Sequence, residues 1–414
     1  MADILLNSWF LWVPAGLFWI FWQAWTGYVR ARFMVNHPPI LLEIKVPRDI
    51  AKSPKAMESI LAGIHGTRRL GNLVERYWDG WITGWFSLEI VGDETGVHFY
   101  IWGQKFFKRM LEAQIYAQYP SAEIKEVEDY TKQLPDTFPE DEWKAWGSEF
   151  LLTKPDAYPI RTYEDFTLED LSSKEEERKV DPLSSLVEFF GALGEGEKFW
   201  LQILVEPAGD DWKKEGEKLA AKLAGRPAAS KASVFGYLVD SVNETLALVF
   251  GLPSPAAPPK KEEQFLMFRL SPGETDVLKA VEKNIAKLGF NICMRWLYLA
   301  RHDKFNYVAV PGIMGIFKQF ASPSLNGFKL NSNVTTSVDY WFEKTRVRLR
   351  AIRLYNAYRL RSCFHPPYSG RSKTFVLNTT ELATIYHFPG LVVGAPSFER
   401  IEAKRGAPPA NLPV

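Results

Sequence analysis

The stretch WFSLEIVGDETGVHFYIW, residues 85–102, decides the fold of the chain around it. Its two arms, WFSLEIV and VHFYIW, are rich in aromatic and β-branched residues, which favour strands. The GDETG between them, residues 92–96, has the composition of a hairpin turn. We therefore expect two antiparallel strands here, and the segments on either side indicate what these strands pack against.

Working outward from this hairpin, the periodicity alternates between strand and helix. Strands are predicted at 40–46 and 122–130, and helices at 53–66, which opens on Ser-Pro, and at 105–119, which Pro120 stops. The order strand, helix, strand, strand, helix, strand is typical of a ferredoxin-like, or split βαβ, sandwich. Residues 38–131 are therefore predicted to form a first module.

A second α/β module is predicted over residues 186–330. FWLQILV, residues 199–205, has the pattern of a buried strand, and Ser271 with Glu274 predicts a capping box at the start of a helix. Residues 226–262 read as an insertion. We expect a second ferredoxin-like sheet interrupted by this insertion, so that the whole chain is α+β.

The remaining segments are assigned by composition. Residues 132–185 are acidic and contain prolines, which predicts a linker, and residues 396–414 form a Pro-rich tail. Within the insertion, residues 233–250 are apolar enough for a helix, but their two acidic residues argue against a membrane span. Residues 331–395 are assigned to a basic helix and a C-terminal docking segment.

The N-terminal segment has no Asp, Glu, Lys, Arg or His from Ile4 through Val29. This uncharged run exceeds the roughly 20 helical residues that cross a bilayer, so residues 1–33 are predicted to form a transmembrane anchor. The alternative is a buried core helix. Because Arg30 and Arg32 follow the run, we expect the N terminus outside and the body in the cytoplasm, at the inner membrane. The tryptophans predicted to contact the headgroup regions are Trp9, Trp12, Trp19, Trp22 and Trp25.

Composition and motifs argue against most enzyme classes. The net charge is +1, and the two cysteines, Cys293 and Cys363, lack metal-ligand spacing. P-loop, dinucleotide-binding and HExxH motifs are absent from the sequence, and its six histidines are scattered. We therefore expect no catalytic residue, no cofactor and no metal.

One basic segment, residues 344–361, stands out because it contains no acidic residue. Its spacing fits a helix, although residues 346–350 also alternate as a strand would. Such a segment can contact phosphates of nucleic acid or acidic lipid, or it can pair within its own chain. The candidate phosphate contacts are Arg346, Arg348, Arg350, Arg353, Arg359 and Arg361.

ELATIYHFPG, residues 381–390, predicts a short helix with Thr380 as its N-cap and Pro389-Gly390 after its end. We expect this segment to dock a partner rather than to catalyse a reaction. Its candidate docking residues are Leu382, Ile385, Tyr386, His387 and Phe388.

Several longer stretches occur in an order that is familiar from one group of proteins. In chain order they are FYIWGQKFFKRMLEAQIYAQYPSAEIKEVEDY, YPIRTYEDF, KVDPLSSLVEFFGALGEGEKFWLQILV, SPGETDVLKAVEKNIAKLGF, GIMGIFKQF, LNGFKLN and FVLNTTELATIYHFPG. Together with the Trp-rich N-terminal segment, they resemble the membrane-anchored, ATPase-proximal region of conjugation and type IV secretion traffic ATPases of candidate-phylum bacteria.

The resemblance implies a P-loop motor domain after the Pro-rich tail, and we expect this motor to be encoded separately or to lie in a region that the sequence does not include. The expected function is a membrane-anchored, non-enzymatic platform that forms a homo-oligomer and docks a motor ATPase moving DNA or protein. The alternative is direct binding of nucleic acid or acidic lipid through residues 344–361.

Overall fold

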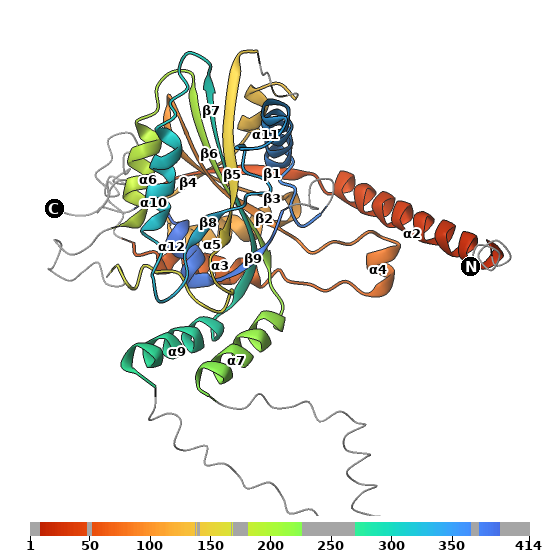
Figure 1. The fold of residues 1–414 in the computed structure, drawn as a ribbon, viewed down its shortest axis with the longest axis horizontal. Helices are drawn as coiled ribbons and strands as arrows, with labels where there is room; N and C mark the ends of the chain where they lie inside the picture. Colours follow the sequence, from red (N-terminus) through yellow and green to blue (C-terminus); the bar gives the residue numbers. More distant parts are fainter. Residues whose placement is uncertain are drawn as a thin grey trace, which may run out of the picture.

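A computed structural model describes residues 9–47, 52–136, 138, 141–166, 168, 181–225, 270–365 and 372–389. The expected α+β fold is confirmed in its coarse form: within these ranges one antiparallel sheet of nine strands carries helices on both faces (Figure 1). The order across the sheet is β4-β1-β3-β2-β6-β7-β5-β8, and β9 pairs with β7.

The strands are β1 (Pro39–Lys45), β2 (Phe86–Asp93), β3 (Gly96–Gln104), β4 (Glu123–Val127), β5 (Trp143–Leu152), β6 (Glu197–Pro207), β7 (Gly289–Arg301), β8 (Phe328–Leu330) and β9 (Phe375–Asn378). The helices are α2 (Trp9–Asn36), α3 (Lys55–His65), α4 (Leu73–Tyr77), α5 (Lys108–Gln118), α6 (Pro182–Gly191), α7 (Asp211–Leu223), α9 (Pro272–Ile285), α10 (Ala309–Lys318), α11 (Glu343–Arg359) and α12 (Thr379–Ile385).

The first half of the sheet has the connectivity that its periodicity predicts. β1, α3, β2, β3, α5 and β4 follow one another in the chain, and their strands lie in the order β4-β1-β3-β2. The β2–β3 hairpin pairs Asp93 with Gly96, and Gly96 has a φ of 124°, a conformation that glycine adopts without a Cβ clash.

The second half repeats this connectivity with β5, α6, β6, β7, α10 and β8, and again its first and third strands are central. Its first strand, β5, lies inside the range 132–185 that the sequence analysis assigned to a linker, so that assignment is wrong for residues 143–152. The acidic, Pro-containing flanks of β5 hid its pattern. The capping box of Ser271 and Glu274 at the start of α9 is confirmed.

The two halves share one sheet instead of forming separate sandwiches. β2 pairs with β6 from Phe86 opposite Val205 to Gly92 opposite Phe199. These two strands would each be the exposed edge of an isolated half, and both are apolar and buried over most of their length. Pairing them removes two edges from water, which is a general way to avoid uncontrolled strand addition.

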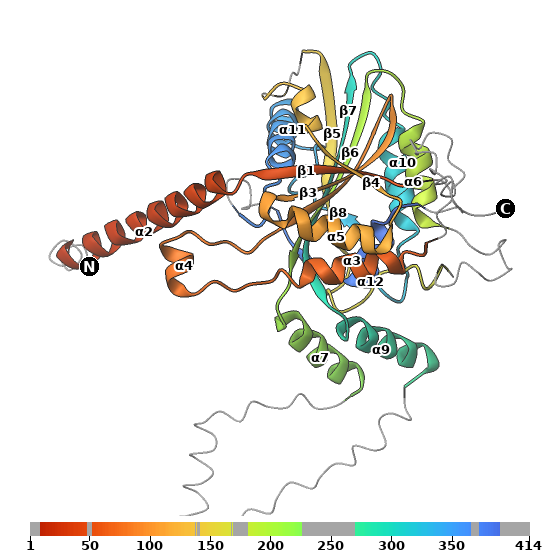
Figure 2. The same ribbon diagram turned by 180° about the vertical axis from the view of Figure 1, so that it is seen from behind.

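Each face of the sheet has its own core. On one face α3, α5, α6, α10 and α12 cover a continuous apolar cluster, and Figure 2 shows these helices from behind. The other face is covered by α11 and by segments that follow β4, and its cluster includes Trp102, Trp200 and Tyr355. α7 and α9 pack on each other beyond the end of the β6–β7 pair.

The α11 face of the sheet contains a row of polar side chains, which we call the polar row. Four residues are successive cross-strand neighbours in it. Glu89 in β2 lies opposite Gln202 in β6, Gln202 lies opposite Arg295 in β7, and Arg295 lies opposite Glu149 in β5. All four are at most 1% exposed. Charges at such depth need partners, because an unpaired buried charge costs several kcal/mol.

Arg361, just after α11, supplies the main partner. Its Nε and Nη2 donate to the two carboxylate oxygens of Glu89 at 3.0 and 3.1 Å, and its guanidinium also pairs with Asp129. Although burial opposes the charge on Asp129, Arg361 holds the pKa of that carboxyl below its ordinary value. Arg361 has a φ of 47°, in the left-handed region that non-glycine residues rarely adopt. This conformation ends α11, because the N–H groups of Arg361 and Ser362 donate to the carbonyls of Tyr358 and Ala357 at 3.0 and 3.1 Å, as in a Schellman motif.

The insertion at 226–262, its predicted helix at 233–250, the acidic residues 169–180 and the tail at 396–414 lie outside the described residues.

Arg361→Ala should destabilise the body strongly, because it leaves the buried Glu89 carboxylate and the half-buried Asp129 carboxylate without their cation. Loss of one partner of a buried pair typically lowers the free energy of unfolding by about 3–5 kcal/mol. Urea unfolding of the purified full chain in detergent, followed by tryptophan fluorescence, measures this change. Arg346→Ala, an exposed change on α11, should shift the free energy by no more than about 0.5 kcal/mol. Equal effects of the two substitutions would contradict this role for Arg361.

Candidate functional site

The basic segment forms α11, which decides between the two predicted structures in favour of the helix. Its arginines do not form one phosphate-binding face. Arg361 is buried against Glu89 and Asp129, and Arg359 pairs with Asp136 and donates to the carbonyl of Pro135. The prediction that Arg361 contacts phosphate is therefore wrong, because its guanidinium is buried and paired within the chain. For Arg359, which is partly engaged by Asp136 and Pro135, contact with phosphate stays a prediction.

Two further arginines hold the loop before α11. Arg350 donates through Nη1 to the carbonyls of Thr335 and Ser332 at 2.8 and 3.0 Å. Arg346 donates to the carbonyl of Trp341 at 3.0 Å, and its guanidinium lies 4.8 Å from the ring centre of Tyr340. These contacts fix the side chains without burying them completely, so part of each guanidinium still faces solvent.

An open groove of about 680 Å³ runs along the outer side of α11. Its lining residues are Phe342, Thr345, Arg346, Leu349, Arg350, Ile352, Arg353 and Asn356. Arg348 lies on the exposed side of the same helix, outside this lining. Phe342, 75% exposed, and its neighbour Trp341, 84% exposed, add apolar surface at the end of the groove where α11 begins. Guanidinium groups beside exposed aromatic rings are suited to phosphate or carboxylate ligands. For the arginines that line this groove, contact with phosphate therefore stays a prediction.

The predicted docking segment is packed inside the body. Leu382, Ile385, Tyr386, His387 and Phe388 are all at most 2% exposed. The Tyr386 hydroxyl donates to the carbonyl of Tyr100 at 3.0 Å. These five side chains therefore pack against their own chain, and their assignment to partner docking is wrong for the folded body.

His387 and the start of α12 also have intramolecular roles. The His387 ring contacts the carboxylate of Asp181 at 3.2 Å and the carbonyl of Ala383 at 2.9 Å. The N-cap of α12 is Asn378, which forms a capping box with Glu381, and not Thr380 as the sequence pattern predicted. Asn378 is the last residue of β9, so the strand leads directly into the helix.

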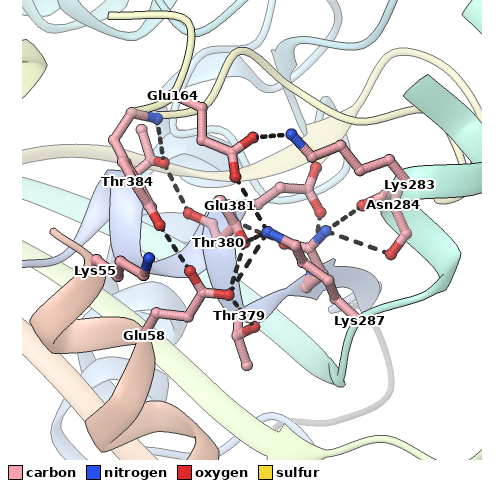
Figure 3. Close-up of polar contacts among 12 residues, drawn as sticks. Lys55, Glu58, Glu164, Lys283, Asn284, Lys287, Thr379, Thr380, Glu381 and Thr384 are labelled. Carbon is pink, nitrogen blue, oxygen red and sulfur yellow. Dashed lines mark hydrogen bonds and ion pairs between the residues drawn. The ribbon is translucent and has the colours of Figure 1, made fainter. Parts of the chain in front are cut away.

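Polar contacts fasten α12 to both halves of the sheet, as Figure 3 shows. Glu58 of α3 accepts from the hydroxyls of Thr379 and Thr380 at 3.1 and 2.9 Å. Lys287 lies 3.6 Å from the Glu58 carboxylate and 3.3 Å from that of Glu164, which also pairs with Lys283. We call this cluster the α12 seam, because it joins α3 of the first half to α9 and the 155–166 segment of the second.

Glu381 is the most perturbed carboxyl of the seam. It is 1% exposed, and burial raises its pKa to about 8, although the backbone N–H groups of Asn378 and Ile160 both donate to it at 2.9 Å. A protonated carboxyl in a core can act as an acid or a base, but such a role needs access to a substrate.

The geometry of the seam favours a structural role. The adjoining cavity measures only about 100 Å³ and is lined by Thr162, Glu164, Lys283, Asn284, Lys287 and Thr380 among others. The acidic side chains that line it have partners at hydrogen-bond distance, for instance Asp165 with the N–H of Thr162 at 2.7 Å. In the part of the chain that the structure describes, no group of three or more His, Cys, Asp or Glu side chains could hold a metal ion.

Residues 35–393 match the family described as "Domain of unknown function (DUF8128)". The chain belongs to this family. A comparison with curated proteins finds no match. The matched range includes the whole sheet, α11 and the α12 seam, and it begins where α2 ends.

All but the last two residues of α2 lie before the family match. This helix extends away from the body (Figure 1). Within residues 9–21 of this helix, the large apolar side chains that are more than half exposed are Trp9, Phe10, Trp12, Leu17, Phe18, Trp19, Ile20 and Phe21. Trp22 and Trp25, the last predicted belt residues, are half-buried. No helix within the described ranges has the length and hydropathy that crossing a membrane requires.

An arm that the sequence pattern did not predict accompanies α2. Residues 66–85, between α3 and β2, leave the body, form the one-turn helix α4 and return (Figure 1). Trp25 donates from Nε1 to the carbonyl of Tyr77 at 2.8 Å, and the rings of Trp22 and Tyr77 lie 5.1 Å apart. The sequence feature that could have indicated this arm is the group of three tryptophans at 78, 81 and 85, which follows Arg68 and Arg69.

Glu381→Gln should remove part of the pH dependence of stability. Between the pKa of an ordinary glutamate, about 4.3, and about 8, the folded chain holds a proton that the unfolded chain has lost. The free energy of unfolding therefore decreases as pH rises through this window, by at most about 1.4 kcal/mol for each pH unit. The slope of unfolding midpoints against pH should be smaller in the variant.

Glu274→Gln is a matched control, because Glu274 also closes a capping box but is exposed. This control should keep the slope of the natural chain between about pH 5 and pH 8. If Glu381→Gln keeps that slope as well, Glu381 is ionised in the folded body and the account of its burial is wrong.

Proposed function

We propose that the protein is a membrane-anchored, non-enzymatic assembly platform, in which α2 inserts into a bilayer and the nine-stranded body faces partners. The observation that carries the proposal is the exposed apolar surface of α2. Removing a large apolar side chain from water stabilises by about 1.5–3 kcal/mol, so the eight exposed side chains within residues 9–21 together represent on the order of 10 kcal/mol. A helix with this surface needs an apolar environment.

The positions of the tryptophans support a bilayer as that environment. Trp9 and Trp12 lie at one end of the apolar run, and Trp22 and Trp25 lie at the other. Tryptophan favours the headgroup regions on both sides of a membrane. Arg30 and Arg32 follow directly, which supports a single-pass orientation with the N terminus outside and the body in the cytoplasm, at the inner membrane.

The construction of the body supports a platform. Its two halves are joined through β2–β6, the polar row and the α12 seam, and these joints use many of the buried charged side chains. The outer strands β4 and β8 each have a neighbour on one side only, which would allow a second copy of the chain to pair there. The motor ATPase as partner rests on the resemblance of the sequence.

Flotation of the full chain with lipid vesicles tests the anchor. Trp19→Glu combined with Phe18→Glu should move the protein from the floating to the soluble or aggregated fraction, because a charge at the centre of a membrane helix costs about 2.5–3.5 kcal/mol. Trp341→Glu is the control, since Trp341 is exposed on the body and should not affect flotation. Flotation of all three proteins to the same extent would contradict anchoring by α2.

The same vesicles test the platform. A P-loop ATPase encoded beside the gene should float only when the anchored chain is present. If the purified ATPase stays at the bottom of the gradient with and without the chain, the chain is not a docking platform for that motor.

The groove along α11 favours a second candidate function, the binding of nucleic acid or acidic lipid. Arg346, Arg350 and Arg353 line the groove next to Phe342 and Leu349. Arg346→Glu with Arg353→Glu should abolish salt-sensitive binding of a labelled single-stranded DNA, because phosphate contacts dominate such affinity. Lys218→Glu, an exposed change on α7, should leave it unchanged. Binding that persists in the double variant with the same dependence on salt would exclude the groove as the site.

A further inference from the structure

The arm formed by residues 66–85 is fixed in place although its helix buries nothing. α4 has no buried residue, yet its N terminus carries a complete capping box of Asn72 and Glu75. Gly80 has a φ of 74° and lies so close to α2 that a Cβ there would be 2.1 Å from the carbonyl oxygen of Val29. Ile82 and Trp85 at the return end of the arm pack in the core of the α11 face, whereas α4 itself has this local order without a buried residue. Its outward side chains are therefore available to something outside the chain.

The outer surface of the arm is apolar. Leu70, Leu73, Val74 and Trp78 are 61–72% exposed. Trp78 also packs against Trp25, with ring centres 5.5 Å apart, so the apolar surface of the arm continues into that of α2. Isolated exposed apolar residues are common, but a continuous group of this kind marks an interaction site.

Four arginines lie next to this surface, together with two acidic residues of the arm, Glu75 and Asp79. Arg69 and Arg76 on the arm are exposed, and Arg30 and Arg32 lie at the adjacent end of α2. Arg69 packs over the ring of Trp81 at 4.8 Å and pairs with Glu75, which fixes its direction. Apolar side chains with tryptophan and flanking arginines are the composition of segments that lie in the boundary between headgroups and acyl chains.

The depth of the arm along α2 agrees with this boundary. The arm contacts α2 at Trp22, Trp25 and Val29, all within eight residues of the first charge at Arg30. At about 1.5 Å per residue, these contacts lie within about 12 Å of that charge along the helix. If Arg30 and Arg32 reach the headgroups, the arm lies at the same level.

We propose that α4 and its flanking turns form a second, interfacial membrane contact, in which Leu70, Leu73, Val74 and Trp78 enter the headgroup boundary and Arg76 contacts anionic headgroups. This inference rests on the proposed insertion of α2. Its consequence is orientation: one helix alone allows the body to rotate and tilt, whereas a second contact beside it fixes which face of the sheet is turned to the membrane.

Site-directed fluorescence in the full chain tests this contact. The natural cysteines, Cys293 and Cys363, are free and buried, so a thiol-reactive, polarity-sensitive dye should label an introduced surface cysteine selectively. Three single variants are needed: Val74→Cys on the arm, Trp19→Cys on α2 and Glu217→Cys on the exposed side of α7. Each is reconstituted in vesicles with about two parts phosphatidylcholine to one part phosphatidylglycerol, with and without lipid that carries a nitroxide near its headgroup.

The dye at Val74 should shift its emission to shorter wavelength on reconstitution and lose intensity with the nitroxide lipid, whereas the dye at Glu217 should do neither. If Trp19→Cys responds and Val74→Cys does not, α2 is anchored but the arm contacts no lipid, and its apolar surface then belongs to a protein partner. If neither responds, the proposed anchor fails as well. The two failures are therefore distinguishable.

The role of the arginine is tested separately. Adding Arg76→Glu to the Val74→Cys chain should reduce the quenching in the vesicles that contain phosphatidylglycerol and leave it unchanged in vesicles of phosphatidylcholine alone. Equal quenching in both lipid mixtures, with or without the substitution, would overturn the contact with anionic headgroups.

Discussion

The buried pairing of Arg361 with Glu89 and Asp129 constrains much of this structure. Glu89 lies in β2, at the joint between the halves, and its neighbour across the joint is Gln202, whose amide donates to it at 2.9 Å. A carboxylate in this position is tolerable only if a cation reaches it, and the cation comes from far along the chain. α11 must therefore pack on this face, and its left-handed end at Arg361 brings the guanidinium to Glu89. The packing of α11 on this face also completes the apolar cluster that contains Trp102 and Trp200 of the sheet.

The α12 seam closes the opposite face in a comparable way. Glu58 belongs to the first half, Glu164 and Lys287 to the second, and Thr380 to the helix between them. Because each half contributes a charge, neither half can complete the cluster alone. The body therefore behaves in this account as one unit, and the segment that resembles a docking motif in the sequence serves this internal joint.

Local features of the fold could be predicted from sequence, while long-range ones could not. The hairpin at 85–102 and the capping box at Ser271 follow from turn chemistry and periodicity, which act over a few residues. β5 was missed because its pattern lies between acidic segments, and the shared sheet was missed because edge pairing leaves no local signal. The arginines of α11 show the same limit, since composition cannot distinguish the buried Arg361 from the exposed Arg346.

The body and the N-terminal region thus differ in how they use apolar surface: the body buries it between helices and sheet, whereas α2 and the arm leave it outside. Electron cryomicroscopy of the full chain in a lipid nanodisc tests this contrast most directly. The account predicts that the disc encloses α2, that α4 lies at the disc surface, and that the nine-stranded sheet lies outside with Arg361 still paired to Glu89. A map in which α2 packs against the body or a second protein, with both α2 and α4 outside the disc, would contradict it.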